Sequence, residues 1–335
     1  MLLRRSACGV VFTLVLLSAA AAPQSYGPAA GPQASCIPAA ALGGIAPSEP
    51  FSSGEDVVRL RKQVEEVSLT LSVTDHGRPV LGLNPDNFSV IDDNQEVRQL
   101  LGFHPVDGIS IRIGLLMDWS DSVQDRLQFE QQVAEEFARQ MIRMEEDEAF
   151  VLSVGTRTEL TQPLTSNPEE IRAALRPSRP GRLTSLYDAI ATACAGEMRK
   201  PSAHSALRRA LLVISDGEDT NSMVRLQEAI QDAQRGDVAV YAITNGGHGT
   251  GESGNGYKVL RAMAAQTGGR AFVIKNEQQL AAAIAEIRND LRNGYTLSYK
   301  PQSLDRNGHF RAIQVATHDR KYRVLVRRGY FAPQD

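Results

Sequence analysis

Side chains with oxygen donors follow an apolar stretch in the first half of the chain. Asp118, Ser120 and Ser122 come directly after the apolar run Ile111–Met117, with the spacing D-x-S-x-S. A near-continuous apolar run of this kind is typical of a parallel strand that is covered on both faces. In open α/β sheets, ligands bind outside the carboxyl ends of such strands. The motif therefore places one carboxylate and two hydroxyls where we expect a ligand.

Two later segments repeat this arrangement. Asp216 follows the apolar strand predicted at 210–215, and Thr184 stands at the start of a predicted helix. Carboxylate and hydroxyl oxygens are hard donors, which suit Mg²⁺ or Ca²⁺ better than zinc or copper. The sequence thus predicts one divalent cation, Mg²⁺ in the first place with Mn²⁺ or Ca²⁺ as alternatives. Its five predicted ligands are Asp118, Ser120, Ser122, Thr184 and Asp216.

Several neighbouring residues are candidates for the rim of this site or for a supporting role behind the ligands. They are Trp119, Asp121, Asp188, Glu218 and Asp219. Each has a simpler alternative. Asp188 lies early in a predicted helix, where a carboxylate favours the helix dipole, and the loop acids would be solvated. Trp119 is expected to be exposed, either as a rim contact or packed on its own loop.

The elements around these residues alternate between strand and helix. Such alternation indicates right-handed βαβ units and a mostly parallel, doubly wound sheet, which we expect over 107–293. We expect strands at 149–154, 210–215, 238–244 and 271–274, and helices at 123–144, 168–175, 185–198, 225–234, 257–267 and 278–291.

The flanking segments, 65–106 and 294–335, have strand patterns without helical crossovers. Residues 67–73 alternate between apolar and polar, which is typical of a half-buried strand. Further strands are expected at 88–91, at 97–103 as the return strand of a hairpin, and at 295–299, 310–317 and 322–328. Because these strands should be antiparallel, we expect the two flanks to form one small β-sandwich, into which the α/β domain is inserted.

The first 21 residues are typical of a secretory signal peptide, with Arg4 and Arg5, an apolar run and small residues at the end. Residues 22–64 are rich in Ala, Pro, Gly and Ser and are expected to be a flexible linker. We therefore expect an exported protein, periplasmic, at the cell surface or secreted, with no transmembrane helix in the mature chain. A disulfide between Cys36 and Cys194 and a buried, unpaired Cys194 both remain open at this point. The formal net charge of −3 argues against nucleic acid as a partner.

The metal-ligand pattern resembles the metal-ion-dependent adhesion site of von Willebrand factor A (vWA) domains. The resemblance covers about 109–293. It implies that Ser120, Ser122 and Thr184 bind the cation directly. Asp118 and Asp216 would bind it through water molecules or alternate between direct and water-mediated binding. It also implies that an Asp or Glu of a partner protein completes the coordination. Two features depart from the family pattern. Trp119 and Asp121 occupy positions of the first motif that often hold smaller residues, and Arg182-Leu183 replaces the Gly-Gly that often precedes the threonine, here Thr184.

A longer resemblance covers most of the mature chain. Segments at 73–95, 184–190 and 214–220, and the ending RRGYFAP at 327–333, are similar to an exported bacterial family of vWA-related proteins first recognised in acidobacteria. This resemblance adds little about function.

Three kinds of function compete for this chain. The first is an adhesion or protein–protein interaction module that depends on a divalent cation and is not an enzyme. The second is a structural envelope protein in which the metal only stabilises the loops. The third is a phosphatase-like hydrolase, which would need a second aspartate two residues after Asp118, where this chain has Ser120.

Overall fold

The computed structural model describes residues 66–119, 127–175, 183–204, 206–245 and 254–334. All of them belong to one compact unit, Arg61–Asp335. The predicted signal peptide and linker lie outside the described residues, and the predicted domain boundaries stay predictions.

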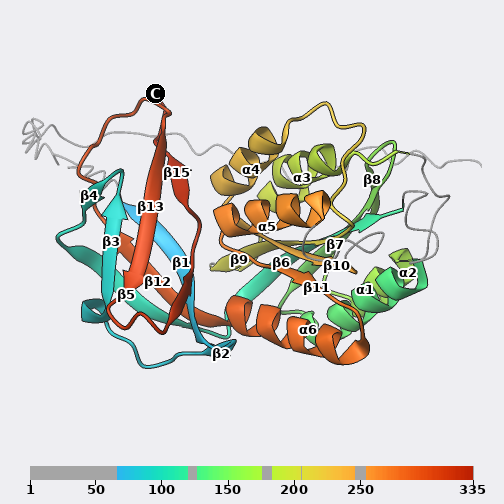
Figure 1. The fold of residues 1–335 in the computed structure, drawn as a ribbon, viewed down its shortest axis with the longest axis horizontal. Helices are drawn as coiled ribbons and strands as arrows, with labels where there is room; N and C mark the ends of the chain where they lie inside the picture. The colour runs from blue at the N-terminus through green and yellow to red at the C-terminus, as the bar shows by residue number, and fades with distance from the viewer. Residues whose placement is uncertain (1–65, 120–126, 176–182, 205, 246–253, 335) are drawn as a thin grey trace, which may run out of the picture. The chain divides into compact units, whose positions relative to one another are not determined.

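A six-stranded sheet forms the centre of the α/β part, with the strand order β11-β10-β9-β6-β7-β8 (Figure 1). All neighbours in it pair in parallel except β7 and β8, which are antiparallel. The chain leaves β6 towards β7 on one side and later returns to β9 on the other. The boundary between β6 and β9 is therefore the topological switch point, where ligands of such sheets bind. The strands are β6 (Ser110–Asp118), β7 (Glu148–Val154), β8 (Glu159–Thr165), β9 (Leu207–Ile214), β10 (Val238–Thr244) and β11 (Ala271–Val273).

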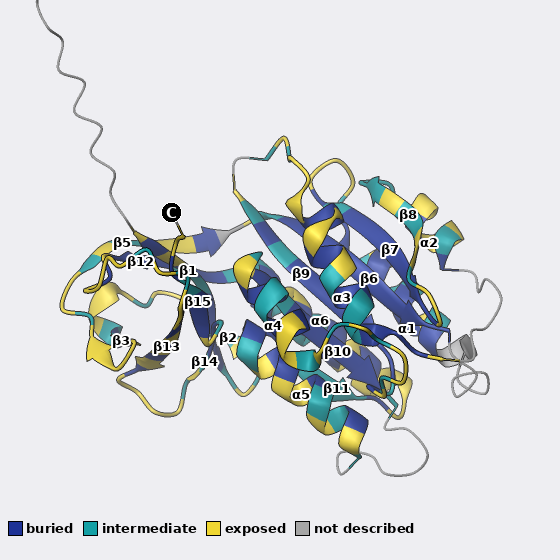
Figure 2. Ribbon diagram, turned by 90° about the horizontal axis from the view of Figure 1, so that it is seen from above, coloured by how far each residue is buried: buried dark blue, intermediate teal, exposed yellow. Residues whose placement is uncertain are grey.

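Helices cover both faces of this sheet (Figure 1), and its central strands are mostly drawn in the dark blue that marks buried residues (Figure 2). One core joins the sheet to α1 (Leu127–Met141), α2 (Pro168–Ala174) and α6 (Glu277–Arg292). The other core joins it to α3 (Leu186–Ala195), α4 (Leu226–Arg235) and α5 (Asn255–Thr267), and a short 3₁₀ helix at Glu197–Arg199 follows α3. The four central strands β10, β9, β6 and β7 are buried between these layers, which explains why their sequences are apolar on both faces.

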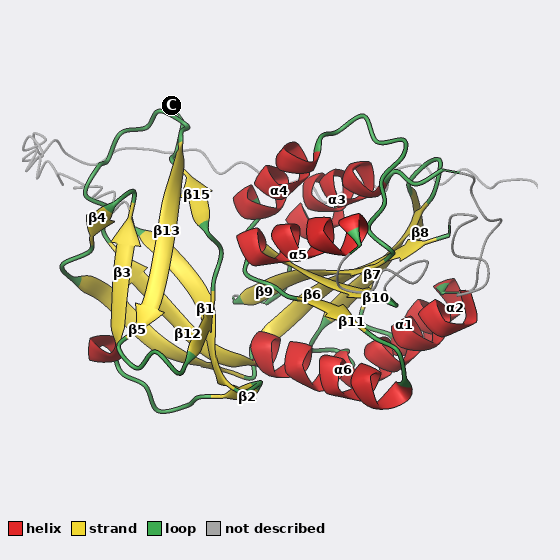
Figure 3. Ribbon diagram, viewed as in Figure 1, coloured by secondary structure: helices red, strands yellow, loops and turns green. Residues whose placement is uncertain are grey.

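Two antiparallel sheets flank the α/β part in the sequence (Figure 3). The first contains β1 (Val67–Asp75), β2 (Arg78–Pro79), β5 (Leu100–Asp107), β12 (Asn293–Tyr299) and β14 (Arg323–Leu325). The second contains β3 (Phe88–Asp92), β4 (Gln95–Glu96), β13 (Phe310–Thr317) and β15 (Gly329–Phe331), and a 3₁₀ turn at Pro85–Asn87 precedes β3.

Strands from the two ends of the chain pair within these sheets. β1 pairs with β12, and β13 pairs with β3. Their inward side chains share one core, in which Phe103 and Tyr295 stack with ring centroids 5.0 Å apart. The chain passes from β5 to β6 and from α6 to β12 with hardly any linker. The predicted architecture, an α/β domain inserted between antiparallel flanks, is therefore confirmed.

Three details of the predicted strands were wrong. The hairpin after β3 returns for only two residues, and the next strand, β5, leaves it to pair with β12 in the other sheet. The strand expected at 322–328 is limited to β14, and a separate strand that was not predicted, β15, follows it in the other sheet. The edge strand β8 was not predicted, because at an exposed edge its sequence ELTQPLT has no buried residue.

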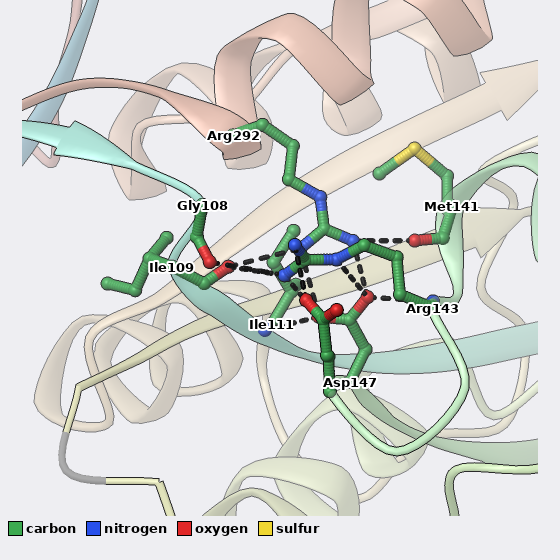
Figure 4. A network of polar contacts seen from close by, with 8 residues as sticks. Gly108, Ile109, Ile111, Met141, Arg143, Asp147 and Arg292 are labelled. Carbon is green, nitrogen blue, oxygen red and sulfur yellow. Dashed lines mark hydrogen bonds and ion pairs between the residues drawn. The ribbon is translucent and has the colours of Figure 1, made fainter.

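The buried carboxylate of Asp147 connects the two segments at which the chain enters and leaves the α/β part, the start of β6 and the end of α6 (Figure 4). Asp147 accepts hydrogen bonds from the backbone N–H of Ile111 and Arg143, at 2.9 and 2.8 Å, and from Arg292 Nη1 at 2.9 Å. Arg292, the last residue of α6, also donates to the carbonyls of Ile109 and Met141. Burial alone would raise the pKa of Asp147, but the hydrogen bonds from Arg292 and Arg143 hold it below its ordinary value.

Candidate metal centre

Two neighbouring strands end side by side at the predicted site. Met117 of β6 lies opposite Ile214 of β9, so that Asp118 and Ser215 stand one step further along each strand. Asp118 is almost fully buried, with 1% of its surface exposed. The Ser215 hydroxyl donates a 2.8 Å hydrogen bond to Asp118 Oδ2. Since a buried carboxylate is costly without polar partners, this bond helps to hold Asp118 at the sheet edge.

The loop after β9 holds Asp216 by its own backbone. Oδ1 of Asp216 accepts a hydrogen bond from the N–H of Glu218 at 3.1 Å, and Ser215 Oγ accepts one from the N–H of Gly217 at 3.0 Å. Gly217 has a φ of +83°, which glycine adopts without strain. A Cβ at this position would lie 2.4 Å from the carbonyl oxygen of Gly256 at the start of α5. The loop thus packs backbone to backbone against α5.

Thr184 stands just before α3 and is tied to the same loop. It is 5% exposed. Its N–H donates to the hydroxyl of Thr220 at 3.0 Å, and its carbonyl accepts from the N–H groups of Thr220 and Asn221, each at 3.0 Å. The Asn221 side chain also donates to the hydroxyl of the next residue, Ser185, at 2.9 Å. The segments that carry Thr184 and Asp216 are therefore held together by several hydrogen bonds.

Three of the predicted residues in the first motif, Ser120, Asp121 and Ser122, lie outside the described residues. Trp119 is described, and it corrects the expectation of an exposed rim residue. It is 3% exposed and packs in the core with Met117. The reason is that Trp119 continues the alternation of β6, and its N–H still donates to Val154 on β7 at 2.9 Å. The side chain therefore points to the same face as Met117.

Two of the other candidate acids, Asp188 and Asp219, accept hydrogen bonds within the loops around the site. Asp188 accepts hydrogen bonds from the backbone N–H groups of Met223 and Val224, at 3.0 and 2.8 Å. Asp219 accepts from the N–H of Tyr187 at 3.2 Å and from the hydroxyl of Ser222 at 2.6 Å. Glu218 is exposed.

The residues Ser215, Thr220 and Asn221 were not predicted as part of the site. Ser215 could have been found from the register, since it stands opposite Asp118 once β6 and β9 are neighbours. The order of strands is a property of the whole fold, however, and the sequence does not give it directly.

The donors in the described part of the site fit a hard cation. Two carboxylates, of Asp118 and Asp216, and one hydroxyl, of Thr184, belong to segments that meet at one edge of the sheet. Among the described residues, there is no group of three or more His, Cys, Asp or Glu side chains that could hold a metal ion by themselves. The donor set is thus a mixture of carboxylate and hydroxyl, which suits Mg²⁺, Mn²⁺ or Ca²⁺.

The family model of the von Willebrand factor type A domain matches residues 113–286. The chain belongs to this family. The match includes Asp118, Thr184 and Asp216 and all three segments that build the site. The narrower resemblance to the exported acidobacterial-type family stays a prediction.

Solved structures of vWA-containing proteins show weaker likenesses. Proximal thread matrix protein 1 from the mussel byssus is 14% identical, with a TM-score of 0.47, and the match covers 59% of this chain and 51% of that protein. BatB from Bacteroides thetaiotaomicron is 22% identical, with a TM-score of 0.38 and coverage of 53% and 97%. The vWF domain of the pilus tip protein Mfa5 from Porphyromonas gingivalis is 17% identical, with a TM-score of 0.30 and coverage of 33% and 39%. The chain thus spans about half of the mussel protein. No curated protein matches the chain.

Two further observations bear on the predicted location and the cysteines. Among the described residues, no helix has the length and apolar character needed to cross a membrane. Cys194 is buried in α3 and has no disulfide partner among the described residues, and burial raises the pKa of its thiol to about 12. Cys36 lies outside the described residues.

Proposed function

We propose that this vWA domain is a protein–protein interaction module that depends on one divalent cation. Asp118, Ser120, Ser122, Thr184 and Asp216 hold the cation, which is Mg²⁺ under ordinary conditions. A carboxylate from an Asp or Glu of the partner protein occupies the remaining position. The observation that carries the proposal is the hydrogen bond between Ser215 and Asp118, which fixes a buried carboxylate beside the loop that bears Asp216.

The charge balance of this donor set favours a ligand from outside. The two carboxylates only match the double charge of the cation, and the remaining donors are neutral hydroxyls. Hard cations of this kind accept six or more oxygen ligands, so positions are left for water or a partner. A carboxylate is the better ligand for such a position because it adds charge as well as an oxygen. A site for tight calcium storage would need more carboxylates.

The same residues argue against an enzyme. Phosphatases of the haloacid dehalogenase type use a pair of aspartates separated by one residue, and this chain has Ser120 at the second place. We therefore propose a binding role without catalysis. We also propose that the protein is exported, on the strength of its first 21 residues.

The test uses Mn²⁺ as a paramagnetic probe of the open coordination position. Water-proton relaxation reports how many exchangeable waters a protein-bound Mn²⁺ carries. We expect Mn²⁺ to enhance relaxation in the wild type, and acetate to reduce this enhancement by replacing a water. Acetamide, which has the same shape without the charge, should have little effect. The Asp118→Ala variant should show no enhancement by bound Mn²⁺.

The alternative of a purely structural metal gives a different result. If Mn²⁺ binds but neither acetate nor acetamide changes the relaxation, the coordination is closed to outside carboxylates. The metal would then only stabilise the loops, and the proposed interaction module would be wrong.

A further inference from the structure

The loop between Thr220 and Val224, which is hydrogen-bonded to the predicted ligand Thr184, presents an exposed methionine. Met223 is 91% exposed. Single exposed apolar residues are common on protein surfaces and need no explanation by themselves. Met223 differs from them because its loop is fixed to the segment that carries Thr184.

The loop is held by hydrogen bonds on both sides of the methionine. The backbone N–H groups of Met223 and Val224 donate to Asp188, which lies in the first turn of α3. Ser222 is held by Asp219 and in turn accepts a hydrogen bond from the N–H of Asp188 at 3.1 Å. Because these hydrogen bonds already order the backbone of the loop, the loop loses little conformational freedom when a partner covers the side chain of Met223. Preorganisation of this kind strengthens binding because the ordering cost has already been met during folding.

A hollow of about 400 Å³ adjoins this methionine. Its lining combines apolar groups with hydroxyls and includes Ser185, the residue next to Thr184. Thr158, another lining residue, has a buried hydroxyl with no hydrogen-bond partner among the described residues. Arg157 is an exposed residue of the lining and carries a positive charge. The lining also contains the carboxylate of Asp188 and the apolar groups of Ala191, Met223 and Val224.

We infer that Met223 and this hollow form a second contact for the partner, which takes an apolar side chain adjacent to the carboxylate that reaches the cation. The inference rests on the proposed function, because the cation supplies the first contact. The doubly charged cation favours an acidic residue, whereas Arg157 and Asp188 in the lining carry opposite charges. Met223 favours an apolar neighbour of that acidic residue. Methionine suits this role because its flexible, polarizable side chain adapts to different apolar shapes. The partner therefore carries an acidic residue flanked by aliphatic residues.

The experiment compares fluorescein-labelled synthetic peptides by fluorescence anisotropy in the presence of Mg²⁺. One peptide has a single Glu flanked on each side by two Leu, a second has Ser in place of every Leu, and a third has the Leu residues with Gln in place of Glu. Burial of one aliphatic side chain is worth about 1.5–3 kcal/mol when complete, so partial burial should favour the first peptide over the second by about tenfold. The third peptide should not bind, and chelation of Mg²⁺ should abolish binding of the first.

Two methionine variants distinguish the second contact from nonspecific hydrophobic binding of the peptide. Met223→Ser should reduce the preference for Leu to about twofold or less, whereas Met144→Ser should keep it. Met144 is a matched control because it is also exposed, at 62%, and follows α1 at the opposite edge of the sheet. The Mn²⁺ affinity of each variant is measured in parallel, so that a loss of the cation is recognised.

The outcomes distinguish the inference from the proposed function. If the wild type binds both Glu peptides equally well and rejects the Gln peptide, carboxylate capture stands and the second contact is wrong. A preference for Leu that survives in Met223→Ser would also overturn it. If no peptide binds in a Glu-dependent way, the proposed function fails, and the inference fails with it.

Discussion

The hydroxyl of Ser215 donates a 2.8 Å hydrogen bond to Oδ2 of Asp118, across the two parallel strands that end at the site. The same hydroxyl oxygen accepts the N–H of Gly217 at 3.0 Å. One side chain thus orients the carboxylate at the end of β6 and also shapes the loop at the end of β9. Residues that support metal ligands in this way are part of the site even when they do not touch the metal.

Replacement of Ser215 by Ala should weaken cation binding without unfolding the protein. Loss of a residue that orients a metal ligand typically lowers metal affinity by about 10–100-fold. The cost in stability should be about 1–3 kcal/mol, since a buried carboxylate loses one of its hydrogen-bond donors. Calorimetric titration with Mn²⁺ measures the affinity. Ser202→Ala is the matched control, because its hydroxyl also donates to a carboxylate, that of Glu148, at 3.0 Å. An equal effect of the two substitutions would contradict the role of Ser215.

Replacement of Gly217 by Ala should destabilise the protein and abolish cation binding. The new Cβ would lie 2.4 Å from the carbonyl oxygen of Gly256, so the loop that bears Asp216 would have to move away from α5. Gly82→Ala is the control, because Gly82 also has a positive φ, +77°, but has no atom within 4 Å of its Cβ position. We expect about 1 kcal/mol for the strain alone in Gly82→Ala and clearly more in Gly217→Ala. Urea unfolding compares the two, and equal losses would show that the contact with Gly256 is not important.

Replacement of Asp147 by Asn should be among the most destabilising single changes in the α/β part. It would leave the inward-pointing guanidinium of Arg292 without its carboxylate partner, and breaking a buried pair in this way typically costs about 3–5 kcal/mol. Glu169→Gln, which removes an exposed pair with Arg172, should cost less than about 1 kcal/mol. Because the pKa of Asp147 is lowered, its stabilisation is present above the ordinary pKa and is lost as the pH falls. Thermal unfolding at pH 7 measures the difference, and equal effects of the two substitutions would refute this view of the network.

Asp290 should give the protein a pH dependence of the opposite sign. It is fully buried in α6, and burial raises its pKa from 3.8 to about 6, although Arg270 and Arg208 act against this shift; Glu286 and Arg323 also face it. The folded protein therefore holds this proton more tightly than the unfolded chain. The resulting stabilisation is complete below about pH 4, falls as the pH rises, and is lost above about pH 6, with a total on the order of 3 kcal/mol.

The Asp290→Asn variant tests this prediction, because Asn does not titrate. Urea unfolding between pH 4 and pH 8 should show a smaller loss of stability with rising pH in the variant than in the wild type. Parallel curves for the two proteins would contradict the prediction.

The sequence predicted the centre of the α/β part well because its central strands, β6, β7, β9 and β10, are buried on both faces. The run before Asp118 is one example, and every helix of the α/β part overlaps a predicted segment. Prediction failed where an element depends on its position in the sheet. The strand β8 lies at an exposed edge, and β5 leaves its hairpin for another sheet, so neither has a local signal. Trp119 was misplaced for a similar reason, since its burial follows from the continuation of β6.

The site could be predicted in part. The types and spacing of Asp118, Thr184 and Asp216 indicated a cation, since each follows a strand or begins a helix. The supporting hydrogen bonds of Ser215, Thr220 and Asn221 depend on which strands and loops are neighbours. This information is contained in the fold and not in any one segment.

The most direct test of the central claim is calorimetric titration of Mg²⁺ and Mn²⁺ into the metal-free protein, with and without saturating acetate, beside the Asp118→Ala variant. We predict one cation per chain in the wild type, tighter binding when acetate is present, and no binding in the variant. Binding of the same strength in the variant, or no binding to the wild type even with acetate, would contradict a cation site at the ends of β6 and β9.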